Sequence, residues 1–80
     1  MVISAQISIY PLRQEHLRPA IDAVRAALEA HNLQPEVGPM STLVVGEMQE
    51  VWTALQEAFT HAATTGHVVM TVTVSNACPV

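Results

Sequence analysis

The clearest pattern in the chain is the strict alternation of apolar and polar residues over residues 3–10. A period of two is typical of a β-strand with one buried and one open face. A similar alternation recurs over residues 67–75. The residues expected to face a core are Ile3, Ala5, Ile7 and Ile9 in the first strand and Val68, Met70, Val72 and Val74 in the last.

Two stretches with apolar residues three and four positions apart predict amphipathic helices. The first should run from about Leu17 to His31, with Pro19 in its first turn and Asn32 as a left-handed terminal residue. The second should follow Gly46 and end at Gly66. The apolar stripe of this second helix, which is predicted to face the core, is formed by Met48, Val51, Trp52, Leu55, Phe59 and Ala62.

The segment between the helices contains two further strands. Residues 38–46 read GPMSTLVVG, in which a Gly-Pro turn signal precedes an apolar, β-branched run that predicts a central strand. Residues 33–39 hold a shorter strand, and Pro35 confines it to the edge of a sheet. Glu47 and Glu50 then fall in the first turn of the second helix, where negative charge complements the helix dipole.

This order of elements predicts an α+β fold. Strand, helix, strand, strand, helix, strand with right-handed crossovers gives a ferredoxin-like βαββαβ sandwich. The expected sheet has four antiparallel strands in the order 4-1-3-2, with both helices on one face. Residues 1–80 should form a single domain.

The sheet face opposite the helices is expected to be polar but uncharged, unlike a solvent-facing sheet, which normally carries charged side chains. Such a face fits contact with either another subunit or a small ligand. Its predicted members are Ser4, Gln6, Ser8, Tyr10, Thr71 and Thr73.

Composition points to association between subunits. Half of the 80 residues are hydrophobic and only 12% are charged, which predicts a homo-oligomer, either a dimer or a tetramer. The net charge of −4, with three arginines and no lysine, argues against nucleic acid as a partner. An acidic field suits a cationic small molecule, although a simply solvated acidic surface is the alternative.

The termini and cysteine content predict a cytoplasmic protein. Cys78 is the only cysteine, so an internal disulfide or a cysteine-based metal knuckle is excluded, as fits a reducing compartment. The first six residues lack the pattern of a signal peptide, and no apolar stretch approaches the ~20 residues that span a bilayer. We therefore expect no membrane association.

Enzymatic signatures are not evident in the sequence. It has no Gly-rich phosphate loop, no Gly-x-Ser-x-Gly elbow and no His-Glu-x-x-His pair. His31 and His61 lie near helix ends, where they are expected to interact with the helix dipole and not with a metal. The expectation is a protein without catalytic residues, metal or cofactor, in which Cys78 is an inert thiol.

Three segments together resemble the small bacterial and archaeal thiamine-binding proteins. They are residues 4–12 (SAQISIYPL), residues 39–44 (PMSTLV) before a glycine and an acidic helix start, and residues 67–70 (HVVM) with a Ser75-Asn76 strand end. The resemblance spans nearly the whole chain. It implies a ferredoxin-like, homo-oligomeric subunit that binds thiamine or its hydroxymethylpyrimidine moiety without catalysis. A structural or regulatory homo-oligomer that binds another metabolite, or none, is the alternative.

A ligand of this kind suits the polar sheet face. An aminopyrimidine presents a donor beside an acceptor, which the carboxamide of Gln6 or Asn76 can match with two hydrogen bonds. The hydroxyls of Ser8 and Thr42 can satisfy the remaining polar atoms, and Ser4 flanks Gln6 on the same face. Alternatively, Gln6 forms hydrogen bonds only across a subunit interface.

Overall fold

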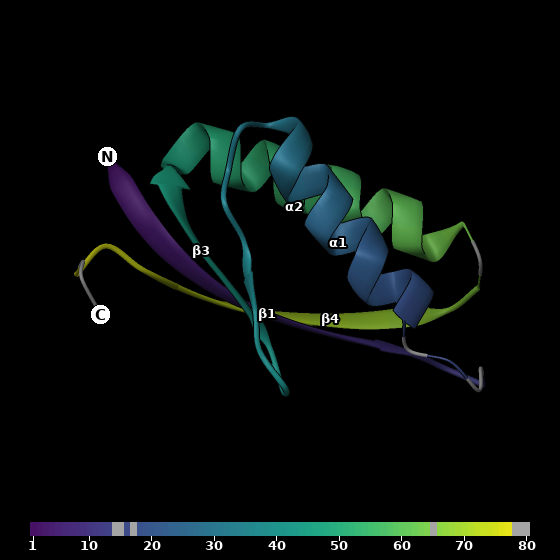
Figure 1. The fold of residues 1–80 in the computed structure, drawn as a ribbon. Coiled ribbons are helices and arrows are strands. Elements are labelled where there is room, and N and C mark those ends of the chain that lie inside the picture. Colours follow the sequence, from purple (N-terminus) through teal and green to yellow (C-terminus); the bar gives the residue numbers. More distant parts are fainter. Residues whose placement is uncertain (14–15, 17, 65, 78–80) are drawn as a thin grey trace.

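The chain folds into a sheet covered on one side by a pair of helices (Figure 1). The computed structural model describes residues 1–13, 16, 18–64 and 66–77. The predicted start of the first helix at Leu17 and the thiol of Cys78 lie outside these residues. The elements are β1 (Val2–Pro11), α1 (Arg18–Ala30), β2 (Glu36–Val37), β3 (Thr42–Glu47), α2 (Met48–Ala63) and β4 (Val68–Ser75).

The sheet has the predicted topology. Its four strands lie in the order β2-β3-β1-β4, which is the predicted order 4-1-3-2 read from the other edge. All neighbouring strands are antiparallel. Both helices lie on the same face of the sheet (Figure 1), so the predicted α+β sandwich is confirmed.

The register of β1 sorts its side chains between the two faces. Ile7 lies opposite Thr42 on β3 and Val72 on β4, and its side chain is 2% exposed beneath the helices. Gln6 lies opposite Leu43 and Thr73 on the other side, which we call the open face. The predicted inward set of β1 is confirmed, because its four members are all buried: Ile3, Ala5, Ile7 and Ile9.

The core is closed by small residues on α2. Ala54 and Ala58 are completely buried, as is Val51, and they pack with Leu28 of α1. Alanine lets the helix backbone approach the sheet and the neighbouring helix closely. The buried side of α2 is Val51, Ala54, Leu55, Ala58 and Ala62.

The predicted core role of three large residues on α2 is wrong. Met48, Trp52 and Phe59 are 42%, 49% and 42% exposed. Each residue of a helix is rotated by ~100° from the one before, so these residues lie roughly 60–120° around the helix from Val51 and Ala58. The predicted stripe counted the large side chains and overlooked the alanines Ala54 and Ala58. Its members Val51, Leu55 and Ala62 are buried as predicted, and the buried side of the helix is centred further toward the alanines.

The connections differ from the predictions in detail. β2 contains only Glu36 and Val37 and is therefore shorter than predicted. The N–H of Leu33 donates to the carbonyl of Leu28 at 3.1 Å and closes the C-terminal end of α1. Asn32 has a φ of 60°, the predicted left-handed conformation. Glu47 ends β3 and occupies the N-cap position of α2 without a capping hydrogen bond from its side chain. Its carboxylate instead accepts a hydrogen bond from the N-terminal ammonium of Met1 at 3.1 Å.

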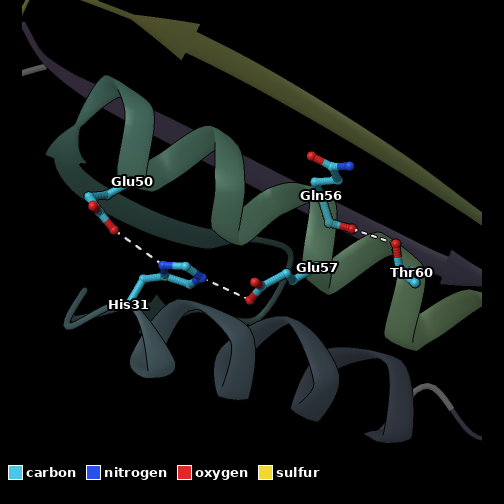
Figure 2. A network of polar contacts seen from close by, with 5 residues as sticks. All are labelled: His31, Glu50, Gln56, Glu57 and Thr60. Carbon is cyan, nitrogen blue, oxygen red and sulfur yellow. Dashed lines mark hydrogen bonds and ion pairs between the residues drawn. The ribbon is translucent and has the colours of Figure 1, made fainter.

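His31 joins the two helices at their outer side (Figure 2). Its Nε2 lies 2.8 Å from a carboxylate oxygen of Glu57, and its Nδ1 lies 3.2 Å from a carboxylate oxygen of Glu50. Hydrogen bonds to Glu57, and then to Glu50, raise the pKa of His31 above its ordinary value of 6.5. His31 was expected to interact with the dipole of its own helix; it follows the last residue of α1 and pairs with two carboxylates of α2.

We predict that Leu28→Ala lowers the free energy of unfolding by about 2–5 kcal/mol, because it leaves a cavity at a fully buried site. Leu43→Ala is the matched control, since Leu43 is 42% exposed on the open face. Chemical denaturation of both variants measures the difference. Equal losses in the two variants would contradict the assignment of the core.

We also predict that the contribution of His31 to stability depends on pH. A folded-state pKa raised above 6.5 means that the contribution is complete below the unfolded pKa and is lost as pH rises through the folded pKa. The stability difference between the wild type and His31→Gln should therefore shrink as the pH is raised above about 6.5. His61→Gln on α2 is the control and should keep the wild-type pH dependence.

Candidate functional site

Gln6 lies in the middle of β1 and projects from the open face. Its Nε2 donates a hydrogen bond to Oγ of Ser41 at 3.1 Å. Ser41 belongs to the turn between β2 and β3, in which the N–H of Gly38 donates to the carbonyl of Ser41 at 2.8 Å. Gln6 therefore ties the central strand to this turn, and its amide oxygen is left to accept a hydrogen bond.

Ser8 reaches the same turn. Its hydroxyl donates to the carbonyl of Met40 at 3.3 Å. Two of the polar side chains predicted to contact a ligand, Gln6 and Ser8, thus converge on residues 40–41. The sequence did not single out Ser41 or Met40 individually, although both lie in the 39–44 segment.

Thr42 does not share the open face with Gln6. It lies opposite Ile7 in the register, so its side chain points toward the helices, and it is only 6% exposed. The expectation that one polar face carries both residues is therefore wrong for Thr42. In the run Thr42–Val45 the side chains do not alternate in polarity, so this pattern does not indicate which residue faces inward.

Ser4 and Asn76 lie toward the opposite end of β1. Ser4 is on the open face but only 6% exposed, between Val45 of β3 and Ser75 of β4. Asn76 directly follows β4 and is exposed. Ser4 and Ser8 are separated by ~14 Å along an extended strand, so the predicted contacts form two groups instead of one cluster.

A hollow of about 140 Å³ lies beside the turn that Gln6 and Ser8 contact. It contains both Ser8 and Thr42, which approach it from different faces of the sheet. We call it the hairpin hollow. Its lining residues are Ile7, Ser8, Ile9, Tyr10, Ile21 and residues 37–42.

The hollow forms because β3 is shorter than β1. β3 pairs with β1 only as far as Ile7, whereas β4 pairs with it as far as Pro11. The end of β1 therefore has an open edge on the side of β3. α1 contributes Ile21 to the lining of the hollow.

The main chain of Ile9 faces this open edge. The N–H of Leu12 donates to the carbonyl of His67 at 2.8 Å, and the carbonyl of Met1 accepts from the N–H of Met48 at 2.9 Å. Because hydrogen-bonded positions alternate along an antiparallel strand, even-numbered residues of β1 bond toward β4 and odd-numbered ones toward β3. Beyond Ile7 no strand residue in the described part of the chain pairs with β1 on the β3 side, so Ile9 presents a free donor and a free acceptor.

A larger hollow of about 470 Å³ lies along β2. It is more open to solvent than the hairpin hollow and contains none of the predicted contact residues. The hairpin hollow is the better candidate because it combines enclosure, hydroxyls and free main-chain groups. The larger hollow is lined by Gln34, Pro35, Glu36, Leu43, Val44 and Val45.

Metal ligands do not gather in the described ranges 1–13, 16, 18–64 and 66–77: no group of three or more His, Cys, Asp or Glu side chains comes together there. In the same residues, neither helix is long and apolar enough to cross a membrane. The donors and acceptors at the hairpin hollow are neutral hydroxyl, amide and main-chain groups. They are suited to hydrogen bonding with a polar heterocycle.

Solved structures of similar proteins share the fold. A Streptococcus pneumoniae protein is 28% identical, with a TM-score of 0.83 over 94% of this chain and 86% of its own. A hypothetical protein from Methanocaldococcus jannaschii is 20% identical, with a TM-score of 0.87 over 99% of this chain and 84% of its own.

A third similar structure carries a functional description. It is a Thermotoga maritima protein assigned provisionally to thiamine biosynthesis or salvage, 21% identical, with a TM-score of 0.81 over 94% of this chain and 83% of its own. No curated protein sequence matches the chain.

A family model gives the relationship at the level of sequence. The model of the YKOF-related family matches residues 2–80, which is nearly the entire length. The match covers both helices and all strands of the sheet, including the turn that forms the hairpin hollow. The chain therefore belongs to the YKOF-related family.

Proposed function

We propose that this protein binds thiamine or its hydroxymethylpyrimidine moiety in the hairpin hollow and carries out no chemistry on it. The observation that carries the proposal is the free main chain of Ile9 beside the hydroxyls of Ser8 and Thr42. An aminopyrimidine has an amino donor next to a ring-nitrogen acceptor. The N–H and C=O of one extended residue offer the complementary pair, as they do to an added strand.

The volume of the hollow favours a single ring. At about 140 Å³ it is smaller than the ~300–1,000 Å³ typical of pockets for drug-sized ligands. The pyrimidine would enter, and the thiazolium ring of thiamine would remain outside. The net charge of −4 favours the approach of that cationic ring.

Gln6 would act at the rim of the site. Its amide nitrogen holds Ser41, and its amide oxygen can accept a hydrogen bond from a ligand that leaves the hollow toward the open face. Ser4 and Asn76 are too far along the sheet to contact the same ring. Contacts from them would require a longer ligand or a second subunit.

The comparisons support the class of ligand only. Membership of the YKOF-related family and the similarity to the Thermotoga maritima protein are consistent with a thiamine-related small molecule. In this proposal the protein is a cytosolic homo-oligomer that acts in uptake, buffering or sensing of the vitamin. The alternative is a structural or regulatory homo-oligomer that binds another metabolite or none.

We predict that hydroxymethylpyrimidine and thiamine both raise the melting temperature. At a ligand concentration 100 times Kd, the stabilisation is about 2.7 kcal/mol, which corresponds to roughly 10 °C or more for a domain of this size. A pyrimidine that lacks the amino group is the control and should give a much smaller shift. A thermal-shift series at constant protein concentration makes the comparison. The proposal fails if neither compound shifts the transition at millimolar concentration.

We predict that Gln6→Leu weakens binding of hydroxymethylpyrimidine and thiamine by about 10- to 100-fold, or roughly 1–3 kcal/mol, because it removes a rim acceptor and the bond to Ser41. Thr73→Val is the matched control, since Thr73 lies opposite Gln6 on the open face but on the β4 side. Calorimetric titration, with the oligomeric state measured alongside, compares the variants. Unchanged affinity in Gln6→Leu would remove this residue from the site.

A further inference from the structure

Within the described part of the chain, the open face carries one unpaired carboxylate, that of Glu36 on β2. Glu36 lies opposite Leu43 of β3, and Leu43 in turn lies opposite Gln6 of β1. Directly opposed residues of an antiparallel sheet project to the same face. Gln6, Leu43 and Glu36 therefore form one row across the open face, from a central strand to the edge of the sheet.

The side chain of Glu36 is exposed and, among residues 1–13, 16, 18–64 and 66–77, has no hydrogen-bond or ion-pair partner. The other acidic residue on this face is Glu47, which lies opposite Val2 and is paired with the N-terminal ammonium at 3.1 Å. The remaining paired carboxylates belong to the helices: Asp22, Glu50 and Glu57. Glu36 is thus free to pair with a cation from outside the chain.

A second hollow lies between Glu36 and the hairpin hollow. We call it the outer hollow, and it measures about 360 Å³. Glu36 and Leu43 line it, together with four residues that also line the hairpin hollow: Val37, Gly38, Pro39 and Ser41. The two hollows therefore adjoin along the turn between β2 and β3. Gln6 lies at their junction, because its amide nitrogen donates to Ser41.

The separation of the two hollows suits a ligand with two linked rings. Ile9, whose free main chain faces the hairpin hollow, lies three residues beyond Gln6, or ~10 Å along β1. A ring bonded to Ile9 in place of a β3 residue lies one strand spacing from β1, whereas Glu36 lies two, which adds ~5 Å across the sheet. This ring is therefore roughly 11 Å from Cα of Glu36. The thiazolium ring of thiamine, joined to the pyrimidine by one methylene group, would lie within the ~8 Å Debye length of the carboxylate.

Leu43 and Glu36 offer complementary contacts to a thiazolium ring, which is flat and permanently positive. Leu43 is 42% exposed and would lie beneath the ring, while the carboxylate of Glu36 would face its charge. Exposed ion pairs contribute modestly to binding, which corresponds to about 2- to 5-fold in affinity. Hydroxymethylpyrimidine has no such charge, so Glu36 would favour thiamine over it.

The same surroundings disfavour a phosphate group. Thiamine phosphates carry their negative charge on the hydroxyethyl arm of the thiazolium ring, so the phosphate would enter the outer hollow beside Glu36. Phosphate sites normally use arginine, lysine or a helix N-terminus. Among the described residues, neither hollow is lined by arginine, lysine or histidine. Arg18 and Arg25 pair with Asp22 on α1, and Arg13 comes after the end of β1, away from the row that holds Glu36.

We propose that Glu36 is the counter-ion of the thiazolium ring and makes the site selective for the unphosphorylated, cationic vitamin over its phosphate esters. The inference rests on the proposed function, because it places the pyrimidine in the hairpin hollow. The thiazolium ring then lies in the outer hollow, over Leu43 and between Gln6 and Glu36. The bound form is the free vitamin and not the phosphorylated cofactor.

Calorimetric titration of three probes into the wild type, Glu36→Gln and Glu36→Lys tests the inference. The probes are hydroxymethylpyrimidine, thiamine and thiamine monophosphate. The wild type should bind thiamine more tightly than its monophosphate. In Glu36→Gln the affinity for thiamine relative to hydroxymethylpyrimidine should fall about 2- to 5-fold, and this difference should shrink as salt is raised to about 0.5 M. Glu36→Lys should reverse the preference, so that the monophosphate binds more tightly than thiamine.

Glu29→Gln is the matched control, because it removes the same charge from α1 on the other side of the sheet. It should keep the wild-type ratio of the two affinities, and circular dichroism should show that all variants are folded. An unchanged ratio in Glu36→Gln, or an equal fall in Glu29→Gln, would overturn the role of Glu36 while leaving the hairpin hollow as the site. If the wild type binds neither thiamine nor hydroxymethylpyrimidine, the proposed function fails and this inference falls with it.

Discussion

The pairing of β1 on both sides is the constraint on which the rest of this structure depends. With β3 on one side and β4 on the other, β1 fixes the register of the sheet, so its odd-numbered side chains enter the core and its even-numbered ones reach the open face. The same pairing fixes the direction of its main-chain groups. The pairing of β3 with β1 ends at Ile7, so the main chain of Ile9 is left at an open edge. The hairpin hollow forms there because β3 is shorter than β1.

A second consequence follows from the size of the residues on α2. Ala54 and Ala58 let this helix lie close to the sheet and to α1, and the large residues Met48, Trp52 and Phe59 are then displaced to its outer flank. An 80-residue domain with half of its residues hydrophobic cannot enclose them all. The surplus therefore lies on the exposed side of α2.

The charged side chains of α2 and the N-terminus lie away from the hairpin hollow and from the exposed apolar residues of α2. Glu50 and Glu57 are held by His31 in the groove between the helices (Figure 2), and the N-terminal ammonium is paired with Glu47. The hairpin hollow is accordingly lined by neutral groups, and the exposed residues Met48, Trp52 and Phe59 of α2 carry no charge.

The sequence by itself determined the order of elements, the topology of the sheet, the inward face of β1 and the left-handed Asn32, because periods of two and 3.6 and turn residues are local properties. It also identified Gln6 and Ser8, which the structure brings to one turn. Only the tertiary structure decided the inward orientation of Thr42, the exposure of Trp52 and the free main chain of Ile9. Each of these depends on which residues a neighbouring strand or helix covers. Neither the apolar run Thr42–Val45 nor the alanines of α2 show in their local sequence pattern which side will be covered.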